Sequence, residues 1–456
     1  MSLSKWVFSL LMQEGRQRKE EGVDGGAVDA AVRGVSAESA LAEIEAAYDA
    51  LMRLSVSPGF PFEEPSDWET IVSLSPLLKQ GKAGVRASEM DGGVLLDRMR
   101  GAWFGRCAAC ALGKPVERGP FMNSRDGVPG WQGIRIYLKG AGAWPLDFYV
   151  PNAGVIEGYD IGCPDSTREH IRFMETDDDI RYTVLGLHVL EQKGAAFTTV
   201  DVAHAWWNVL PIGQTFTAER AAYRNLANTL EQGPLDDGAL DYVRTHRNPF
   251  REWIGAQIRA DGWAYGAAGQ AALGAEFGYR DAALSHVKNG IYGEMLFASA
   301  IAAAFACEDA LAALEQGLQC IPSTSRLAKD VSEAIALGKR AGDLDELHDE
   351  LWKRWGHYDG VHTNNNAALV AAAIAFGGDD FEKTIVAAVT GGWDTDCNGA
   401  TAGSLWGAAY GYGRLPEKWI APLNDTLYAA IPGFHPIAIS ECARRSVETA
   451  LGCAEA

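Results

Sequence analysis

Apolar residues along most of the chain recur at helical spacing. Ile180, Val184 and Leu187 lie three or four residues apart, and long alanine-rich stretches such as 367–376 continue the pattern. Runs of alternating apolar and polar residues, which would indicate strands, are rare. The exception is 134–138, where a short strand is expected. The pattern as a whole predicts an all-α protein.

Breaks in this pattern divide the chain into two parts. Residues 1–54 are charged and helical in pattern, and residues 55–66 contain three prolines and a glycine, which is typical of a linker or a surface arm. We therefore expect an N-terminal helical extension and linker over residues 1–92 and a main helical domain over residues 93–456.

Two segments inside the main domain differ from the rest. Residues 119–165 are rich in glycine and proline, so a long irregular insertion is expected there. Loops of this length are usually functional when they are ordered. Residues 325–355 alternate charged and apolar positions, which predicts a helix or a helix pair with a solvated outer face.

Small residues recur every fourth position in two helical segments. The positions are Gly101, Gly105, Ala109 and Gly113 in the first segment, and Gly399, Gly403, Gly407 and Gly411 in the second. Each helical glycine costs about 1 kcal/mol relative to alanine. Close packing of a neighbouring helix would offset that cost, so we expect a compact helical core with chemistry at the helix ends.

Composition narrows the classes of function. The 456 residues include 40 basic and 60 acidic side chains, giving a net charge of −20. Such a charge argues against broad contact with nucleic acid or an anionic membrane, and the apolar stretches are too short to span a bilayer.

Scattered cysteines and an N-terminus without signal-peptide character favour the cytoplasm. Cys107 and Cys110 have alanine neighbours, which favours a buried helix face over a zinc site.

Two distant acidic clusters carry the strongest chemical signal. Glu175–Asp179 contains four carboxylates and precedes a helical pattern, and Asp394 and Asp396 follow the glycine pair 391–392. Each cluster alone fits either a helix cap or a ligand set. Crowded carboxylates repel one another without a cation, and oxygen-only ligands suit Mg²⁺ or Mn²⁺ better than zinc. A third carboxylate, Glu117, follows the first glycine-rich helix and its terminating Pro115.

These motifs, in this order, resemble the ADP-ribosylglycohydrolase family, which includes dinitrogenase-reductase-activating glycohydrolase and the ADP-ribosyl-acceptor hydrolases. The resemblance covers roughly residues 95–415. It rests on "RMRGAWFGRCAACALGKPVE", "ETDDDIRYTVLGL", "RADGWAYGAAGQ", "LSHVKNGIYGEMLFASAIAAAF" and "GGWDTDCNGATAGSLWGAAYG". It implies a compact orthogonal helical bundle that hydrolyses an ADP-ribosyl N- or O-glycosidic bond. The substrate would be an ADP-ribosylated protein or a small ribosylated molecule.

The same resemblance implies a pair of Mg²⁺ or Mn²⁺ ions at the base of a cleft. Their ligands would be Thr176, Asp177, Asp178, Asp394 and Asp396, with Asp179 and Cys397 as further ligands or supporting residues. Glu117 and Asp177 are both candidates for handling the water proton, and the sequence does not rank them. Cys397 departs from the hydroxyl residue usual in the family, and Arg106 departs from its usual aspartate.

Candidate substrate contacts come from aromatic, glycine and histidine positions between and beside the acidic motifs. Trp263 and Tyr265, with Gly266 in a glycine-rich segment, would either stack on a ligand ring or pack in the core. His286 and Trp393 would likewise either contact the ligand or pack in the core. His362 and the asparagines 364–366 would form either a capped helix start or a polar wall.

Two alternatives to the leading hypothesis remain open. One is an N-ribosyl hydrolase of a smaller ribosylated metabolite or nucleoside, which the altered glycine-rich segment and Trp393 favour. The other is a non-catalytic ADP-ribose-binding descendant of the fold, for which Cys397 is the only sequence support.

Overall fold

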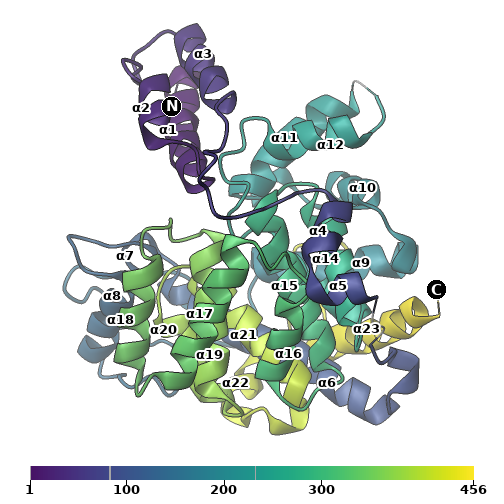
Figure 1. The fold of residues 1–456 in the computed structure, drawn as a ribbon. Coiled ribbons are helices and arrows are strands. Elements are labelled where there is room, and N and C mark those ends of the chain that lie inside the picture. Colours follow the sequence, from purple (N-terminus) through teal and green to yellow (C-terminus); the bar gives the residue numbers. More distant parts are fainter. Residues whose placement is uncertain (1, 82–83, 232, 456) are drawn as a thin grey trace.

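The computed structural model describes residues 2–81, 84–231 and 233–455, which form α-helices and short 3-10 turns joined by loops (Figure 1). Across these residues, pairing between extended segments is limited to isolated bridges. The prediction of an all-α protein is confirmed.

The first three helices form a small unit at one end of the molecule (Figure 1). They are α1 (Leu3–Glu20), α2 (Gly25–Ala31) and α3 (Leu41–Met52). Leu11, Ile44 and Leu51 are among the residues of its own buried core, which is separate from the large one. We call residues 2–54 the N-terminal unit.

The large core begins before the predicted boundary at residue 92. Ile71 and Ala87 are buried in it, so the segment with α4 (Trp68–Leu74) and α5 (Pro76–Gln80) packs on the main domain. The further helices of the main domain are α6 (Gly92–Gly113), α7 (Gly119–Met122), α8 (Gly130–Gly140), α9 (Asp178–Lys193), α10 (Thr199–Val209), α11 (Thr217–Leu230), α12 (Asp237–Thr245), α13 (Ala260–Gly266), α14 (Ala271–Ala282), α15 (Lys288–Ala304), α16 (Ala310–Leu318), α17 (Arg326–Arg340), α18 (Leu344–Trp355), α19 (Thr363–Gly377), α20 (Phe381–Thr390), α21 (Thr395–Tyr410), α22 (Glu417–Ile420) and α23 (Ile439–Ala454).

The two glycine series pack against each other. Helices α6 and α21 run antiparallel, and an added Cβ at Gly105 would clash with the carbonyl oxygen of Gly403, as one at Gly101 would with that of Gly407. The same close approach brings Gly113, at the end of α6, against Thr395, at the start of α21. The expected close packing is therefore present, and it joins the helix ends that carry Glu117 and Asp394.

The strand expected at 134–138 is wrong. These residues belong to α8, which buries Trp131, Ile134 and Leu138 at helical spacing. Ile134, Ile136 and Tyr137 favour strands intrinsically, but the helical face packs on the core and outweighs that preference. The insertion 119–165 is thus partly helical, through α7 and α8.

Other local predictions agree with the structure. Residues 325–355 form the helix pair α17 and α18, with Lys329 and Glu333 on the exposed side. Cys107 and Cys110 are buried on α6, and all eight cysteines are free. No helix in the described part of the chain is long and apolar enough to cross a membrane.

Candidate active site

A cavity of about 420 Å³ lies where the two acidic clusters meet. One side is polar and comes from the loop after α6 and the starts of α9 and α21. The other side comes from the start of α11 and from two loop segments near residues 254–258 and 361. The lining residues are Lys114, Glu117, Thr176, Asp177, Asp178, Arg181, Gly213, Gln214, Phe216, Thr217, Glu219, Ile254, Gly255, Ile258, Val361, Asp394 and Cys397.

The start of α21 supplies carboxylates that the protein itself leaves unsatisfied. Asp394 occupies the N-cap position, yet its side chain accepts no capping hydrogen bond. The Oδ1 atoms of Asp394 and Asp396 are buried and have no hydrogen-bond partner. Burial raises the pKa of Asp394, and burial with the charges of Glu117 and Asp177 raises that of Asp396 well above its usual value. The cap interpretation therefore fails for Asp394, because its carboxylate is not used as a cap.

The start of α9 uses its carboxylates differently. Asp177 caps the helix, accepting the Asp179 N–H at 2.9 Å, and its other oxygen lies 2.5 Å from the Lys114 ammonium. Burial opposes ionisation, but Lys114 holds the pKa of Asp177 below its usual value. Burial together with the charges of Asp177 and Asp394 raises the pKa of Asp178 to about 7. Asp177 is thus both a cap and part of an ion pair.

Thr176 and Glu117 complete the polar side of the cavity. The Thr176 hydroxyl accepts a hydrogen bond of 3.0 Å from Arg181. Glu117 follows a 3-10 turn that extends α6, and it is half-buried. Burial and the nearby Asp394 and Asp177 carboxylates raise the pKa of Glu117 well above its usual value.

Asp179 does not line the cavity, and its carboxylate is bonded to residues of the core. Its Oδ1 lies 3.2 Å from Arg106, which also forms an ion pair of 2.7 Å with Asp261. Its Oδ2 accepts a hydrogen bond of 3.0 Å from the Cys397 thiol. Arg106 and Asp179 are both fully buried. Asp179 therefore orients Cys397, and Arg106 supplies the charge that makes its burial tolerable.

These residues fit a bound cation. Ligand atoms of Asp394, Asp396 and Cys397 lie within 4.8 Å of one another, and those of Cys110, Asp177, Asp179 and Asp396 do the same. Crowded carboxylates with raised pKa values and buried oxygens without a hydrogen-bond partner are features of a cation-binding site. The site is a buried acidic cluster that could hold a metal ion.

The five residues proposed for substrate contact do not line the cavity. Trp263 stacks on Phe197 with ring centroids 4.5 Å apart, and the Tyr265 hydroxyl pairs with Ser404 at 2.8 Å. Gly266 lies in the same buried helix, α13, whose apolar face packs in the core. For these three residues the core-packing alternative describes their position.

His286 and Trp393 are buried as well. The His286 ring contacts the Ser285 hydroxyl at 2.8 Å in the core. Trp393 stacks on Trp352 with centroids 4.9 Å apart and has a positive φ of 59°. Trp393 therefore anchors the turn that presents Asp394.

Several residues at the site carried no sequence signal. Lys114, Phe216 and Glu219 line the cavity, and Glu219 is held by Arg259 at 2.8 Å. Asn366 accepts the Asp394 N–H at 3.1 Å, so the asparagine run does support the site, while His362 caps α19 as the simpler interpretation proposed. Phe216 and Glu219 lie far along the chain from the acidic motifs, and Lys114, although three residues before Glu117, has no feature in the sequence that singles it out.

Comparison with known proteins identifies the family of the chain. A solved structure described as an ADP-ribosylglycohydrolase-related protein complex is 18% identical, with a TM-score of 0.49, and the match covers 79% of this chain and 99% of that one. No curated protein sequence matches the chain. The sequence model of the ADP-ribosylglycohydrolase family matches residues 92–447, which include every helix that contributes to the cavity. The chain therefore belongs to the ADP-ribosylglycohydrolase family.

Proposed function

We propose that this protein is a metal-dependent hydrolase that cleaves an ADP-ribosyl N- or O-glycosidic bond, using two Mg²⁺ or Mn²⁺ ions. The observation that carries the proposal is the pair of buried, unpartnered oxygens of Asp394, which lines the cavity with Thr176–Asp178, and of Asp396, which lies behind it at the start of α21. Membership of a glycohydrolase family supports it. The substrate would be an ADP-ribosylated protein or a small ribosylated molecule.

The ligands would come from both clusters. Thr176, Asp177 and Asp178 would bind from one side, and Asp394 and Asp396 from the other. Bound cations would supply Lewis-acid chemistry, holding ribose hydroxyls and a water in fixed geometry. Cys397 would complete the set only for a cation that tolerates sulfur, because a thiol is a poor partner for Mg²⁺.

The chain's own carboxylates would manage the water proton. Of the two candidates, Asp177 already caps α9 and pairs with Lys114, whereas no described residue donates a hydrogen bond to Glu117. A proton acceptor at Glu117 therefore needs no existing bond to break. We assign Glu117 that role and assign Asp177 to positioning.

The test is release of ADP-ribose from arginine-linked and serine-linked acceptors by the purified protein with Mg²⁺ or Mn²⁺. Glu117→Gln should lower kcat about a hundredfold or more. Asp165→Asn, an exposed carboxylate outside the cavity, is the matched control and should retain full activity. Absence of hydrolysis at every linkage tested with either ion would refute the proposal.

A smaller riboside is the second candidate substrate. The aromatic pair proposed to stack on an adenine, Trp263 and Tyr265, is buried away from the cavity, which leaves Phe216 as the aromatic residue in its wall among the described residues. Thermal stabilisation by ribosides, without stabilisation by ADP-ribose, would favour this candidate. Calorimetry without any divalent-ion binding would instead favour a non-catalytic descendant of the fold.

A further inference from the structure

The N-terminal unit lies outside the family-matched residues 92–447 but is joined to the main domain by buried charges. Arg251 of the main domain lies 2.8 Å from Glu14 and 2.9 Å from Glu21, both on or next to α1. Gln17 donates a hydrogen bond of 2.7 Å to Glu252. All five side chains are at most 3% exposed. The contact is therefore an ordered interface built mainly from polar groups.

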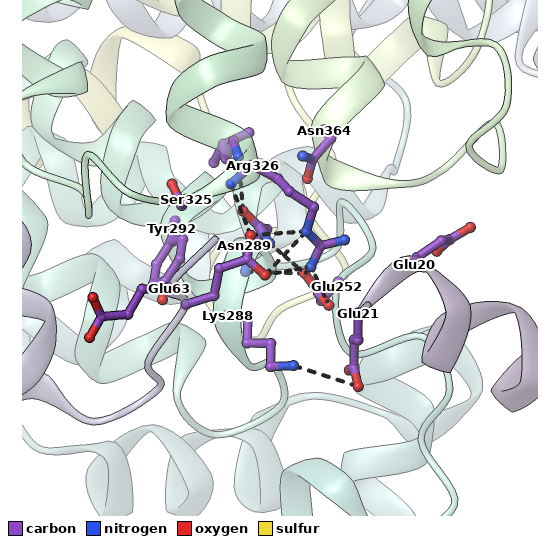
Figure 2. A network of polar contacts seen from close by, with 12 residues as sticks. Glu20, Glu21, Glu63, Glu252, Lys288, Asn289, Tyr292, Ser325, Arg326 and Asn364 are labelled. Atoms are coloured by element: carbon purple, nitrogen blue, oxygen red, sulfur yellow. Dashed lines mark hydrogen bonds and ion pairs between the residues drawn. The ribbon is translucent and has the colours of Figure 1, made fainter. Parts of the chain in front are cut away.

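Figure 2 shows the middle of this interface. Arg326 lies against Glu252 at 2.7 Å, and Lys288 reaches toward Glu21 at 3.6 Å. Arg326 also pairs with Glu64, in the linker that follows the N-terminal unit, at 2.7 Å. Buried ion pairs of this kind add little net stability, but their directional contacts fix the relative position of the parts they join.

A second contact lies a short distance away. Arg16 pairs with Asp359 at 3.1 Å, and Glu20 lies 3.6 Å from the His362 ring. Asp359 and His362 flank Val361, which lines the cavity. Arg251, in the first contact, is likewise three residues before Ile254, another lining residue. Both contacts with the N-terminal unit therefore fall directly beside the cavity wall.

The two wall segments are bonded to each other. The Ile254 N–H donates to the Val361 carbonyl at 2.9 Å, and the Thr363 N–H donates to the Glu252 carbonyl at 3.1 Å. Trp253 and His362 form an isolated antiparallel bridge between them. This short ladder presents Ile254 and Val361 to the cavity, and it contacts the N-terminal unit through Glu252 and His362.

We infer that the N-terminal unit is a positioning element for the substrate side of the cavity. Through Glu14, Glu21 and Gln17 it fixes residues 251–255, and through Arg16 and Glu20 it fixes residues 359–363. The carboxylate side is held chiefly by the packing of α6 on α21. Asn366 links its Asp394 to Gly360 and His362, and that link does not involve Glu14 or Arg251. The inference depends on the proposed function in one respect, which is that the group bound in the cavity is the ribosyl group of the substrate.

If the N-terminal unit positions the cavity wall, disrupting its contact with the main domain should weaken substrate binding and leave metal binding intact. A wall that contacts substrate equally in the ground and transition states affects KM and leaves kcat unchanged. Glu14→Gln combined with Arg251→Gln removes one charge of each sign, so no additional charge is left unpaired. Glu38→Gln is the matched control, because Glu38 is on the same unit and its exposed pair with Lys5 is not one of the interface contacts.

Three measurements test the inference. In the double variant, the amides of Ile254 and Thr363 should exchange hydrogen about tenfold faster, and the Kd for ADP-ribose measured by calorimetry with Mn²⁺ should rise about tenfold. Mn²⁺ affinity should stay within about twofold of wild type, since Glu14 and Arg251 contact none of the proposed ligands. Glu38→Gln should leave all three quantities unchanged.

Several outcomes would overturn it. If hydrogen exchange became faster only in α1, with Ile254 and Thr363 unchanged, the N-terminal unit would have no effect on the cavity wall. An equal loss of Mn²⁺ affinity would indicate general destabilisation. If ADP-ribose binds neither wild type nor variant, the proposed function fails, while the exchange result still decides the positioning role. If the double variant does not fold, Arg16→Ala with Glu20→Ala poses the same question at the second contact, with the same readouts.

Discussion

The side-chain oxygen of Asn366 accepts the backbone N–H of Asp394 at 3.1 Å. The same oxygen accepts a hydrogen bond of 2.8 Å from Asn398, and the Asn366 amide donates to the His362 carbonyl at 2.8 Å. One buried amide thus ties the turn before α21 to the start of α19. It fixes the backbone at Asp394 and leaves the carboxylate free.

Asn366→Ala should therefore weaken metal binding without touching a ligand. We expect about a tenfold loss of Mn²⁺ affinity by calorimetry, since supporting residues around metal ligands typically contribute 10- to 100-fold. Asn364→Ala is the control, because Asn364 is equally buried in the same helical turn but bonds Asp330 instead. Equal effects of the two variants on affinity would contradict the assigned role of Asn366.

Asp396→Asn should separate metal binding from stability. Without metal, the variant removes one charge from a cluster whose carboxylates are destabilised by burial and by one another, so its melting temperature should equal or exceed that of wild type. With Mn²⁺ at about 100 times its Kd, wild type should gain about 2.7 kcal/mol and the variant much less. Differential scanning calorimetry with and without Mn²⁺ measures both. A metal-free variant markedly less stable than wild type would show that Asp396 has a structural role.

Packing of α6 on α21 should make Gly105 intolerant of any side chain. Gly105→Ala forces a Cβ against the Gly403 carbonyl oxygen, and we expect a cost of about 1–3 kcal/mol in the free energy of unfolding. Gly452→Ala is the matched control, since this helical glycine of α23 has nothing within 4 Å of an added Cβ. Alanine there should stabilise by up to about 1 kcal/mol. Urea unfolding of both variants checks the opposite signs.

Much of this arrangement could be predicted from local sequence patterns. The four-residue spacing of Gly101–Gly113 and of the second glycine series reports helix packing directly, because backbone contact requires the absence of a side chain. The carboxylates of Asp177–Asp179 and Asp394–Asp396 stand out for a similar reason, since like charges crowd only where something compensates them, whereas Glu117 stands out by its place after the first glycine-rich helix.

What the sequence could not supply is the partner of each polar group. Lys114 pairs with Asp177, Arg106 with Asp179 and Asp261, and Asn366 with Asp394, over separations that only the fold determines. For two aromatic residues, the sequence suggested a role that the fold does not give them. Trp263 and Tyr265 have side chains suited to stacking on a ligand, but burial of their helix face in the core outweighs that use.

Stability of the interface with the N-terminal unit should fall as pH rises, because of Glu20. Burial, with the charges of Glu252 and Asp359, raises the pKa of Glu20 to about 8 from 4.5, against the opposing effects of Arg326 and Arg16. Between those two values the folded protein keeps a proton that the unfolded chain has lost. The contribution is therefore fully present below pH 4.5 and is lost as pH rises through about 8.

Glu20→Gln should remove that dependence, because glutamine stays neutral at every pH. The difference in unfolding free energy, wild type minus variant, should fall by roughly 3 kcal/mol between pH 5.5 and 8.5. His362, which faces Glu20 at 3.6 Å, does not interfere, because burial lowers its pKa to about 3, below this window. Urea unfolding at both pH values measures the difference. A constant difference would mean that Glu20 is ionised in the folded protein and that the contact with residues 359–363 does not depend on its protonation.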